Sequence, residues 1–382
     1  MNKIPPVDLA RQYQLISEET GLAVLDVLRS GQYIGGGVVT EFERRFADYV
    51  GVSHCVSCNS GTDALYLALR ALGIGNRDEV ITSTFTFIAT SEAITLVGAK
   101  PVFVDIERST FNLDLESLEL ALTPKTKAII VVHLFGQPLN MTRLLDFAQA
   151  HGLYVIEDCA QATGATWQSQ KVGSIGHIGC FSFFPTKNLG GCGDGGAITT
   201  SNAALAESMR MIKEHGSRIR YTHESLGINS RLDSIQAAIL QVKLGYLDDW
   251  NKAREQIAQR YQELLAPLPY LELPQVIPGG QHVWNQYTIL IPELESSPHR
   301  DQIRDSLQQQ GILSMVYYPI PLHLQPVYQT LGYSKGSFPV SEQICREVLS
   351  LPMFPDLTFG EQQRIAYSLK DCLVLNSSAL LP

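Results

Sequence analysis

The stretch AIIVVHLFGQPLNMTRLLDFAQAHGLYVIED, residues 128–158, decides the fold. Apolar, β-branched runs at 128–132 and 154–156 enclose an amphipathic segment at 141–151, which predicts two buried strands joined by a helix. Strands joined in this way lie parallel in one sheet, with the connecting helix packed on a face of the sheet.

The same alternation continues on both sides of this unit, from about residue 50 to residue 200. It predicts a mostly parallel sheet that is covered by helices on both faces, and therefore a large α/β domain. The other runs expected as strands are 80–82, 101–104, 180–183 and 196–199, and the other expected helices are 63–72 and 88–96.

The last third of the chain has a different pattern. Apolar residues at a spacing of three and four predict one or two long helices over 232–264, and a Pro- and Gly-bearing stretch at 268–280 precedes a strand-like run at 287–291. We assign 1–250 to the large domain and 251–382 to a small α+β domain, on which the N-terminal segment could also pack. Further helices are expected near 298–310, 339–350 and 359–372.

The composition of the 382-residue chain is that of a globular protein, with 45% hydrophobic and 18% charged residues. Lys and Arg number 29 against 38 Asp and Glu, so the net charge is −9 and nucleic acid is a poor partner. The sequence has neither a signal-like N-terminus nor an apolar run of about 18 residues. We therefore expect a cytoplasmic protein that does not enter a membrane.

Seven cysteines form an odd and scattered set, which is typical of reduced thiols. Cys55 and Cys58 form a lone C-x-x-C pair, for which zinc or redox chemistry is an alternative. Because no second pair lies at zinc-ribbon spacing and the segment has the pattern of a short buried strand, we interpret both as inert thiols.

The segment CNSGTDAL, residues 58–65, ends a predicted strand and opens a predicted helix. Its small residues bring backbone N–H groups and hydroxyls to a helix N-terminus, where an anion such as phosphate is stabilised. The alternative is that Ser60 or Thr62 only caps the helix.

Asp158, in IEDCAQ at 156–161, stands at the carboxyl end of a buried strand, where α/β sheets bind their ligands. Its carboxylate is a suitable partner for a cationic heterocycle. The alternative is that Asp158 caps a following helix.

Lys187 lies in FSFFPTKNLGG, residues 181–191, between an aromatic strand and a glycine-rich loop. A lysine held in surroundings of low polarity loses its proton near neutral pH and then acts as a nucleophile or a proton carrier. The alternative is an ordinary surface lysine.

Taken together and in this order, the three segments match the needs of pyridoxal phosphate. This cofactor requires an anchor for its phosphate, a carboxylate for its ring nitrogen and a lysine for its aldehyde. A protonated ring then stabilises the carbanion that forms when the α-proton of a substrate leaves.

At this point the chain resembles the DegT-type nucleotide-sugar aminotransferases, a branch of the fold type I pyridoxal phosphate enzymes, over nearly its whole length. The resemblance implies a three-layer, mostly parallel sheet of the aspartate aminotransferase type, with a smaller α+β C-terminal domain. The matching segments are SGTDAL at 60–65, TFTFIAT at 84–90, EDCAQATGA at 157–165, FSFFPTKNLGG at 181–191, GDGGAI at 193–198, GINSRLD at 227–233 and YYPIPLHLQP at 317–326.

The resemblance also implies roles for individual residues. Lys187 would form the internal aldimine and move protons, Asp158 would pair with the pyridine nitrogen, and Gln161 would contact the ring hydroxyl. Phe87 would stack on the ring. The residues implied in phosphate binding are Gly61, Thr62, Ser182 and, across a dimer interface, Asn229, and those implied in substrate binding are Arg231, Tyr317 and His323.

The reaction that the resemblance implies transfers an amine from an amino acid, usually glutamate, to a keto sugar on a nucleotide diphosphate. The 317–326 segment is similar to branches that aminate carbon 3, so we expect a 3-keto sugar on dTDP or UDP and a homodimer with shared sites. Two alternatives stay open: a cofactor-binding regulatory protein without turnover, and a nicotinamide oxidoreductase. The second is disfavoured because no G-x-G-x-x-G opens an early helix. For His133, a buried and satisfied histidine is the favoured interpretation over a cofactor contact.

Overall fold

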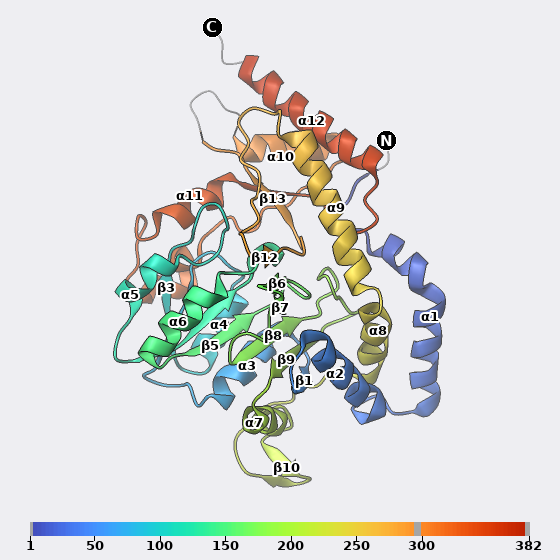
Figure 1. Ribbon diagram of the computed structural model, residues 1–382, viewed down its shortest axis with the longest axis vertical. Coiled ribbons are helices and arrows are strands. Elements are labelled where there is room, and N and C mark those ends of the chain that lie inside the picture. The colour runs from blue at the N-terminus through green and yellow to red at the C-terminus, as the bar shows by residue number, and fades with distance from the viewer. Residues whose placement is uncertain (1–2, 294–298, 379–382) are drawn as a thin grey trace.

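A computed structural model describes residues 3–293 and 299–378 of the chain (Figure 1). A seven-stranded sheet forms its centre, made of β1 (His54–Cys58), β2 (Glu79–Ser83), β3 (Lys100–Val104), β4 (Thr126–Val132), β5 (Tyr154–Asp158), β8 (Ile178–Ser182) and β9 (Gly196–Thr200). The strand order is β1-β9-β8-β5-β4-β2-β3. Strand β9 is antiparallel to both neighbours and every other pair in this sheet is parallel, so the predicted mostly parallel sheet is confirmed.

Helices cover both faces of the sheet, because its strands are apolar on both sides. In β4, Ala128 and Ile130 pack on one face, while Ile129 and Val131 pack on the other. The helices on the first face are α3 (Gly61–Ala71), α4 (Ala89–Leu96) and α7 (Ala203–Lys213), and those on the second are α2 (Gly36–Val50), α6 (Met141–His151) and α8 (Ser234–Leu244). The predicted three-layer architecture is confirmed.

The long helical stretch expected over 232–264 is divided into two helices, α8 and α9 (Leu247–Leu265), which are separated at Gly245 and Tyr246. Helix α9 connects two hydrophobic cores. Leu247 packs with α2 and α8, whereas Ile257 and Tyr261 pack in the core of the C-terminal part.

The C-terminal part is built around a two-stranded sheet of β13 (Tyr287–Leu290) and β14 (Val348–Leu351). The helix expected over 339–350 ends at Glu347 as α11 (Pro339–Glu347), so that expectation is wrong for its last residues. Val348, Leu349 and Ser350 are buried, and they pair with β13 instead. Helices α10 (Arg300–Gln309) and α12 (Phe359–Ser378) occupy the other expected positions, and residue 298, where the first was expected to begin, lies outside the described residues.

The N-terminal segment packs on this C-terminal core. Ile4 is 1% exposed within it and forms a bridge with Ile312, and the long helix α1 (Leu9–Ser30) follows. The remaining short elements are α5 (Leu118–Ala121), β6 (Thr166–Trp167), β7 (Gln170–Lys171), β10 (Ser217–Ile219), β11 (Thr222–His223), β12 (Gly280–Gln281) and 3-10 turns at Leu115–Ser117, Leu134–Gly136, Leu322–Leu324 and Pro326–Leu331.

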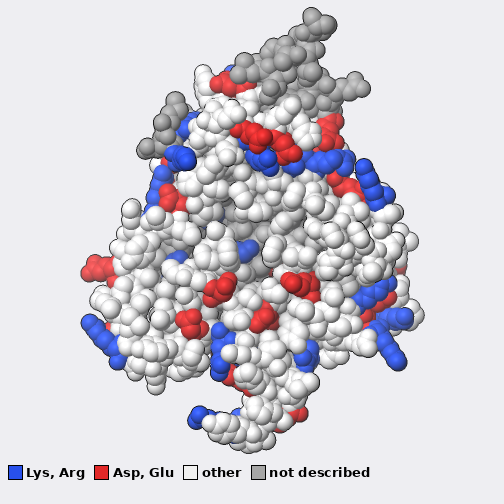
Figure 2. Space-filling model, turned by 180° about the vertical axis from the view of Figure 1, so that it is seen from behind, with Lys and Arg blue, Asp and Glu red and all other residues white. Residues whose placement is uncertain are grey.

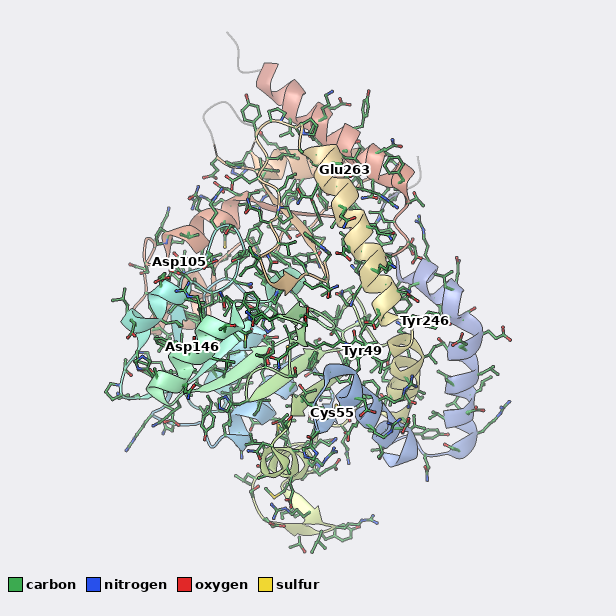
Figure 3. The ribbon with its side chains drawn as sticks, viewed as in Figure 1. Tyr49, Cys55, Asp105, Asp146, Tyr246 and Glu263 are labelled. Carbon is green, nitrogen blue, oxygen red and sulfur yellow. The ribbon has the colours of Figure 1, made fainter. Side chains whose placement is uncertain are left out.

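Polar contacts join the two parts. Asp105, which follows β3, accepts hydrogen bonds from the backbone N–H groups of Val340 (3.0 Å) and Ser341 (2.8 Å) at the start of α11 (Figure 3). Tyr246, between α8 and α9, donates its hydroxyl to Glu19 of α1. These contacts fix α11 and α1 against the large sheet domain.

The surface of the described residues carries charges of both signs. On the face shown in Figure 2, acidic and basic side chains are interspersed between wide uncharged areas. Within 3–293 and 299–378, no helix is both long and apolar enough to cross a bilayer. Seven free cysteines are present, and Cys55 and Cys58 of β1 are both buried.

Candidate active site

Asp158 ends β5, and its carboxylate is 5% exposed. It accepts hydrogen bonds from the Thr90 hydroxyl (2.9 Å) and from the backbone N–H of Ala160 (3.2 Å). Burial raises the pKa of Asp158, while these two hydrogen bonds and the positive charge of Lys187 act in the opposite direction. The chain continues from β5 to β6 through turns, so the alternative in which Asp158 caps a helix is wrong.

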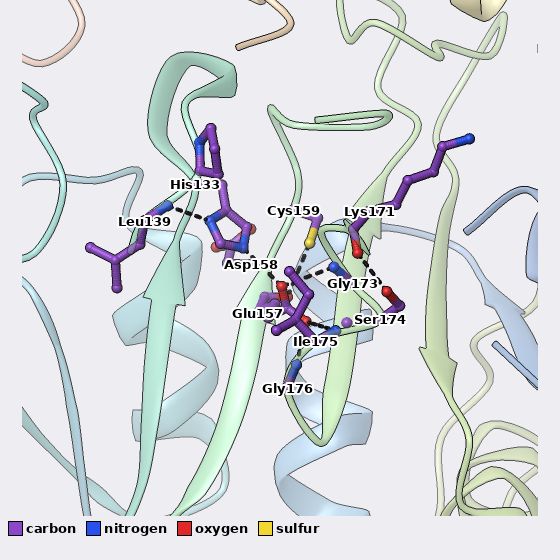
Figure 4. A network of polar contacts seen from close by, with 12 residues as sticks. His133, Leu139, Glu157, Asp158, Cys159, Lys171, Gly173, Ser174, Ile175 and Gly176 are labelled. Atoms are coloured by element: carbon purple, nitrogen blue, oxygen red, sulfur yellow. Dashed lines mark hydrogen bonds and ion pairs between the residues drawn. The ribbon is translucent and has the colours of Figure 1, made fainter. Parts of the chain in front are cut away.

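Glu157 precedes Asp158 and points to the other side of β5, where a polar network holds it (Figure 4). His133 donates from Nε2 to Glu157 (3.0 Å), because its Nδ1 already accepts from the Leu139 N–H (3.2 Å). Further donors to the Glu157 carboxylate are the backbone N–H groups of Gly173 (2.9 Å), Ile175 (2.9 Å) and Gly176 (2.7 Å). His133 is 0% exposed, and its interpretation as a satisfied buried histidine is confirmed.

The Glu157 network also bears on metal binding. Cys159 brings its sulfur within 4.8 Å of the ligand atoms of His133 and Glu157. The carboxylate oxygens, however, already accept four N–H groups, and the sulfur lies 3.7 Å from the Glu157 carbonyl. The cluster is therefore explained as a structural support behind Asp158.

Helix α3 begins beside the end of β8. Ser60 caps the helix by accepting the N–H of Asp63 (3.1 Å), whereas Thr62 lies within the first turn and is not the cap. Capping leaves the N–H groups of Gly61 and Thr62 in the first turn without helical acceptors. A Cβ on Gly61 would lie 2.7 Å from the Cβ of Ser182, so only glycine permits this approach. The predicted phosphate-binding residues of α3 and β8 therefore lie side by side.

Lys187 lies in the tight loop between β8 and β9. The loop folds back on itself through a hydrogen bond from the Gly191 N–H to the Phe183 carbonyl (2.8 Å), and a Cβ on Gly190 would lie 2.2 Å from the Pro185 carbonyl oxygen. Burial lowers the pKa of Lys187 to about 8, although the nearby Asp158 carboxylate acts to raise it. The residue as a whole is half-buried, and the Asp158 carboxylate near its amine distinguishes it from an ordinary surface lysine.

Gln161 connects the end of β5 with the C-terminal part. Its Oε1 accepts the backbone N–H of Phe135 (2.7 Å), and its Nε2 donates to the Tyr318 hydroxyl (3.1 Å). The Tyr318 ring lies 6.2 Å from the ring of Phe87, which is 57% exposed. Tyr317 is half-buried beside it, with ring centroids 5.9 Å apart, and burial raises the pKa of both tyrosines.

Tyr318 is a candidate functional residue that the sequence analysis did not select. Burial and its position near Asp158 raise its pKa, so the hydroxyl stays protonated. The only signal in the sequence was its place beside Tyr317 in the 317–326 segment. Its contact with Gln161, 157 positions away, could not be read from that segment.

Three other predicted residues lie in different surroundings. His323 is 1% exposed, and its ring nitrogens contact the Thr84 hydroxyl (2.8 Å) and the Glu342 carboxylate (3.0 Å), so neither nitrogen is available for direct contact with a substrate. Arg231 contacts Glu214 (3.3 Å), and Asn229 is exposed and paired with Glu214 through a backbone bridge.

The arrangement has three chemical properties that fit pyridoxal phosphate. It presents unused N–H groups at a helix start beside a serine hydroxyl, a buried carboxylate at a strand end, and a lysine whose pKa is lowered toward neutrality. The exposed ring of Phe87 contacts Tyr318, whose hydroxyl accepts a hydrogen bond from Gln161 in the turn that follows β5.

Comparisons with known proteins agree with this chemistry. The model of the DegT/DnrJ/EryC1/StrS aminotransferase family matches residues 14–370. A protein of Geobacillus stearothermophilus named pleiotropic regulatory protein is 47% identical over 364 residues, which cover 95% of this chain and 96% of that protein. The UDP-N-acetyl-3-dehydro-alpha-D-glucosamine 3-aminotransferase of Acidithiobacillus ferrooxidans is 46% identical, with 95% and 96% covered. The X-ray crystal structure of Streptomyces venezuelae DesV in complex with a ketimine intermediate has a TM-score of 0.93 and 41% identity, and covers 97% of this chain and 98% of that one.

Proposed function

Because the chain belongs to the DegT/DnrJ/EryC1/StrS aminotransferase family, we propose that it uses pyridoxal phosphate to transfer an amino group to a nucleotide-linked keto sugar. One observation carries the proposal: the start of α3 against Ser182, the buried Asp158 at the end of β5 and Lys187 in the loop after β8 meet at one edge of the sheet, because β5 and β8 are parallel neighbours. The family assignment removes the nicotinamide oxidoreductase alternative.

The cofactor, when bound, supplies an electron sink for the charge that remains after a substrate loses its α-proton. Lys187 is the residue that would hold the aldehyde carbon. With a pKa of about 8, its amine exists in both protonation states near neutral pH, so it can both accept and return a proton.

The other predicted residues would bind and orient the cofactor. Asp158 would hold the proton on the ring nitrogen, and Gln161 would direct its amide at the ring hydroxyl. Phe87 presents an exposed ring for stacking. The phosphate would accept hydrogen bonds from the N–H groups and hydroxyls of Gly61, Thr62 and Ser182.

We further propose that the acceptor is a 3-keto sugar on UDP or dTDP and that glutamate is the amino donor. Support comes from the Acidithiobacillus relative, whose name places its amination at carbon 3, and from the 317–326 segment. In that segment Tyr317 is half-buried next to Tyr318, so a phenol would face the sugar. The predicted cytoplasmic location stays a prediction.

The acceptor is tested by incubating the purified protein with pyridoxal phosphate, glutamate and single nucleotide sugars. We expect turnover with 3-keto members of a UDP and dTDP panel, and rates at least about tenfold lower with their 4-keto isomers, because a carbonyl displaced by one ring position would not be aligned with the amino group that the cofactor carries or with the proton that Lys187 moves. Amino-sugar formation is measured by mass spectrometry, and the matching 3-hydroxy sugar is the control. Turnover confined to the 4-keto sugars would reject the carbon 3 assignment.

We also propose a homodimer in which Asn229 and Arg231 complete the site of the partner subunit. Both contact Glu214, which lies three residues before the β10–β11 hairpin, and this hairpin projects from the body of the molecule (Figure 1). The hairpin and its flank expose large apolar side chains, as a surface covered by another subunit does. These are Ile219 (70% exposed), Tyr221 (81%) and Leu226 (87%).

A mixture of two inactive variants tests the shared site. Lys187→Ala lacks the amine, and the Asn229→Ala, Arg231→Ala double variant lacks the groups proposed to cross the interface. After the two proteins are unfolded and refolded together, we expect recovery of about a quarter of wild-type activity, because half of the dimers are mixed and each mixed dimer has one intact site. Each variant refolded alone is the control. A site built within one chain would give no recovery.

The regulatory alternative keeps one supporting observation, the name of the Geobacillus relative. A regulatory protein that binds the cofactor without catalysing a reaction would use the same cofactor-binding residues. Activity in the sugar panel separates the two functions, since a binding protein would take up the cofactor and form no amino sugar.

A further inference from the structure

Three asparagines lie around the loop that carries Lys187, and the chemistry proposed above gives them no role. We propose that Asn188, Asn251 and Asn285 form a brace that positions the Lys187 amine for proton transfer. The inference rests on the proposed function because it concerns the lysine of that reaction. It is independent of which sugar is aminated.

Asn188 is the centre of the brace. It follows Lys187 directly, is 3% exposed, and uses its whole amide group. Its Nδ2 donates to Oδ1 of Asn251 (2.7 Å) and to the carbonyl of Val283 (2.8 Å), while its Oδ1 accepts from Nδ2 of Asn285 (2.9 Å). With all three hydrogen bonds made, the side chain has one orientation, and the backbone next to Lys187 is fixed with it.

Asn285 holds the other side of the lysine. It is 2% exposed, and besides Asn188 it reaches the carbonyl of Thr186 at 3.5 Å. The residues before and after Lys187 are therefore held by the same amide. Because the Thr186 carbonyl and the Asn188 side chain are both held, the direction in which the Lys187 side chain projects is fixed.

The brace is anchored in two separate elements. Asn251 belongs to α9 and donates to the carbonyl of Thr163 (3.1 Å), so it ties the network to the turn that follows β5. One helical turn further on, Arg254 donates to the carbonyl of Trp284 (3.1 Å), which precedes Asn285. Helix α9 thus fixes both Asn188 and the backbone of Asn285.

The segment 283–286 also connects the brace with Gln161. The Val283 N–H donates to the carbonyl of Gly136 (3.1 Å), and Phe135 in turn donates its N–H to Gln161 (2.7 Å). Gly136 has φ +100, and a Cβ there would lie 3.1 Å from the backbone nitrogen of Asn285. The same segment therefore determines the separation between Lys187 and the residue proposed to contact the cofactor ring.

Packing alone does not explain why these buried positions carry amide side chains and not apolar ones. Each buried amide must find all its partners or destabilise the protein, whereas an apolar side chain of the same size has no such requirement. Asn188 satisfies both ends of its amide, and Asn285 uses its Nδ2, beside a lysine whose amine has to be held near one position for catalysis. Directional hydrogen bonds supply this restraint and apolar contacts do not.

The first test measures kcat and KM of Asn285→Ala. A displacement of the amine by about 1 Å slows a proton transfer by up to about 100-fold, so we expect kcat to fall about 10- to 100-fold while KM for the sugar stays within about twofold. Asn285→Ser keeps a hydroxyl donor and is expected to recover part of kcat. The matched control is Gln362→Ala, which removes an equally buried amide that donates to the carbonyl of Ile257 in the C-terminal core.

The second test does not depend on activity. Acetic anhydride labelling of the full-length chain prepared without cofactor, followed by peptide mass analysis, gives the pH midpoint at which the Lys187 amine becomes reactive. Below its pKa the amine is protonated and unreactive, so the wild-type midpoint is expected near pH 8. In Asn285→Ala the lysine reaches water more readily, and its midpoint is expected to rise toward the ordinary lysine value of about 10.4. Gln362→Ala is expected to keep the wild-type midpoint.

The outcomes separate the brace from the proposed function. Wild-type kcat and an unchanged midpoint in Asn285→Ala would overturn the brace, whatever the thermal stability of the variant. A wild-type protein that forms no amino sugar but shows the midpoint shift would overturn the proposed function and leave the brace supported. If Asn285→Ala does not fold, kcat and the labelling midpoint are measured on Asn251→Ala instead, which removes the hydrogen bonds to Asn188 and Thr163.

Discussion

Lys187→Ala is expected to lower the rate of amino-sugar formation at least about 10³-fold, because the variant lacks both the amine for the cofactor aldehyde and the base that moves the proton. The amine is well suited to both tasks because burial lowers its pKa to about 8. The measurement is kcat with saturating glutamate and the accepted sugar. Borohydride reduction followed by peptide mapping then tests whether cofactor is attached at position 187.

Lys171→Ala is the matched control. Burial also lowers the pKa of Lys171, but its ammonium lies 3.3 Å from the centre of the Tyr49 ring, away from the residues proposed to bind the cofactor. We expect wild-type kcat and a stability loss of about 1 kcal/mol or less from the lost cation–π contact. A Lys187→Ala protein within tenfold of the wild-type rate would contradict the proposed role. Loss of attached cofactor with unchanged biological activity would favour the regulatory alternative.

Asp158→Asn is the second variant with a large expected effect. Asparagine has the shape of aspartate. Its Oδ1 can accept the Ala160 N–H, and its Nδ2 can donate to the Thr90 hydroxyl oxygen in place of the hydrogen bond that Asp158 accepts there, so the fold should persist. The negative charge that keeps the ring nitrogen protonated is lost, however. Removing one partner of a buried charge pair costs about 3–5 kcal/mol, which corresponds to a fall in kcat of about 10²- to 10⁴-fold. Steady-state kinetics at saturating cofactor measure this fall.

Glu157→Gln controls for the loss of a buried carboxylate. Glu157 lies next to Asp158 but faces the opposite side of β5, where it supports His133 and the turn at 173–176. A neutral amide leaves some of these donors poorly paired, so we expect a loss of about 2–4 kcal/mol of stability and a nearly unchanged kcat for the folded enzyme. Wild-type kcat in Asp158→Asn, or equal kinetic effects in both variants, would reject the role of Asp158.

Local patterns were sufficient for the central sheet. The runs at 128–132 and 154–156 are apolar on both faces, and both became buried parallel strands. The hydrophobic pattern of a segment did not predict its secondary structure where pairing with a distant element determines it. Val348 and Leu349 continue the apolar pattern of α11, and pairing with β13 makes 348–351 a strand. Spacing alone likewise did not show where the stretch 232–264 breaks into α8 and α9.

The candidate site was predictable to the extent that its residues lie in single segments. Gly61 begins a helix, Asp158 ends a strand and Lys187 lies in the loop that follows β8, and the parallel sheet brings such positions to one edge. Contacts between distant positions were not predictable. Asn188 and Asn285 are 97 positions apart, and the motif that contains His323 does not reveal that both ring nitrogens have protein partners.

Helix α9 has a mechanical consequence. Its first turn is embedded in one hydrophobic core and its later turns in the other, with Asn251 between them. Because α9 is one continuous helix, it connects the two hydrophobic cores rigidly, without a flexible linker between them. A rotation of the C-terminal part relative to the sheet would either bend α9 or move Asn251. Because Asn251 is hydrogen-bonded to Asn188, moving it would also displace the neighbouring Lys187 amine.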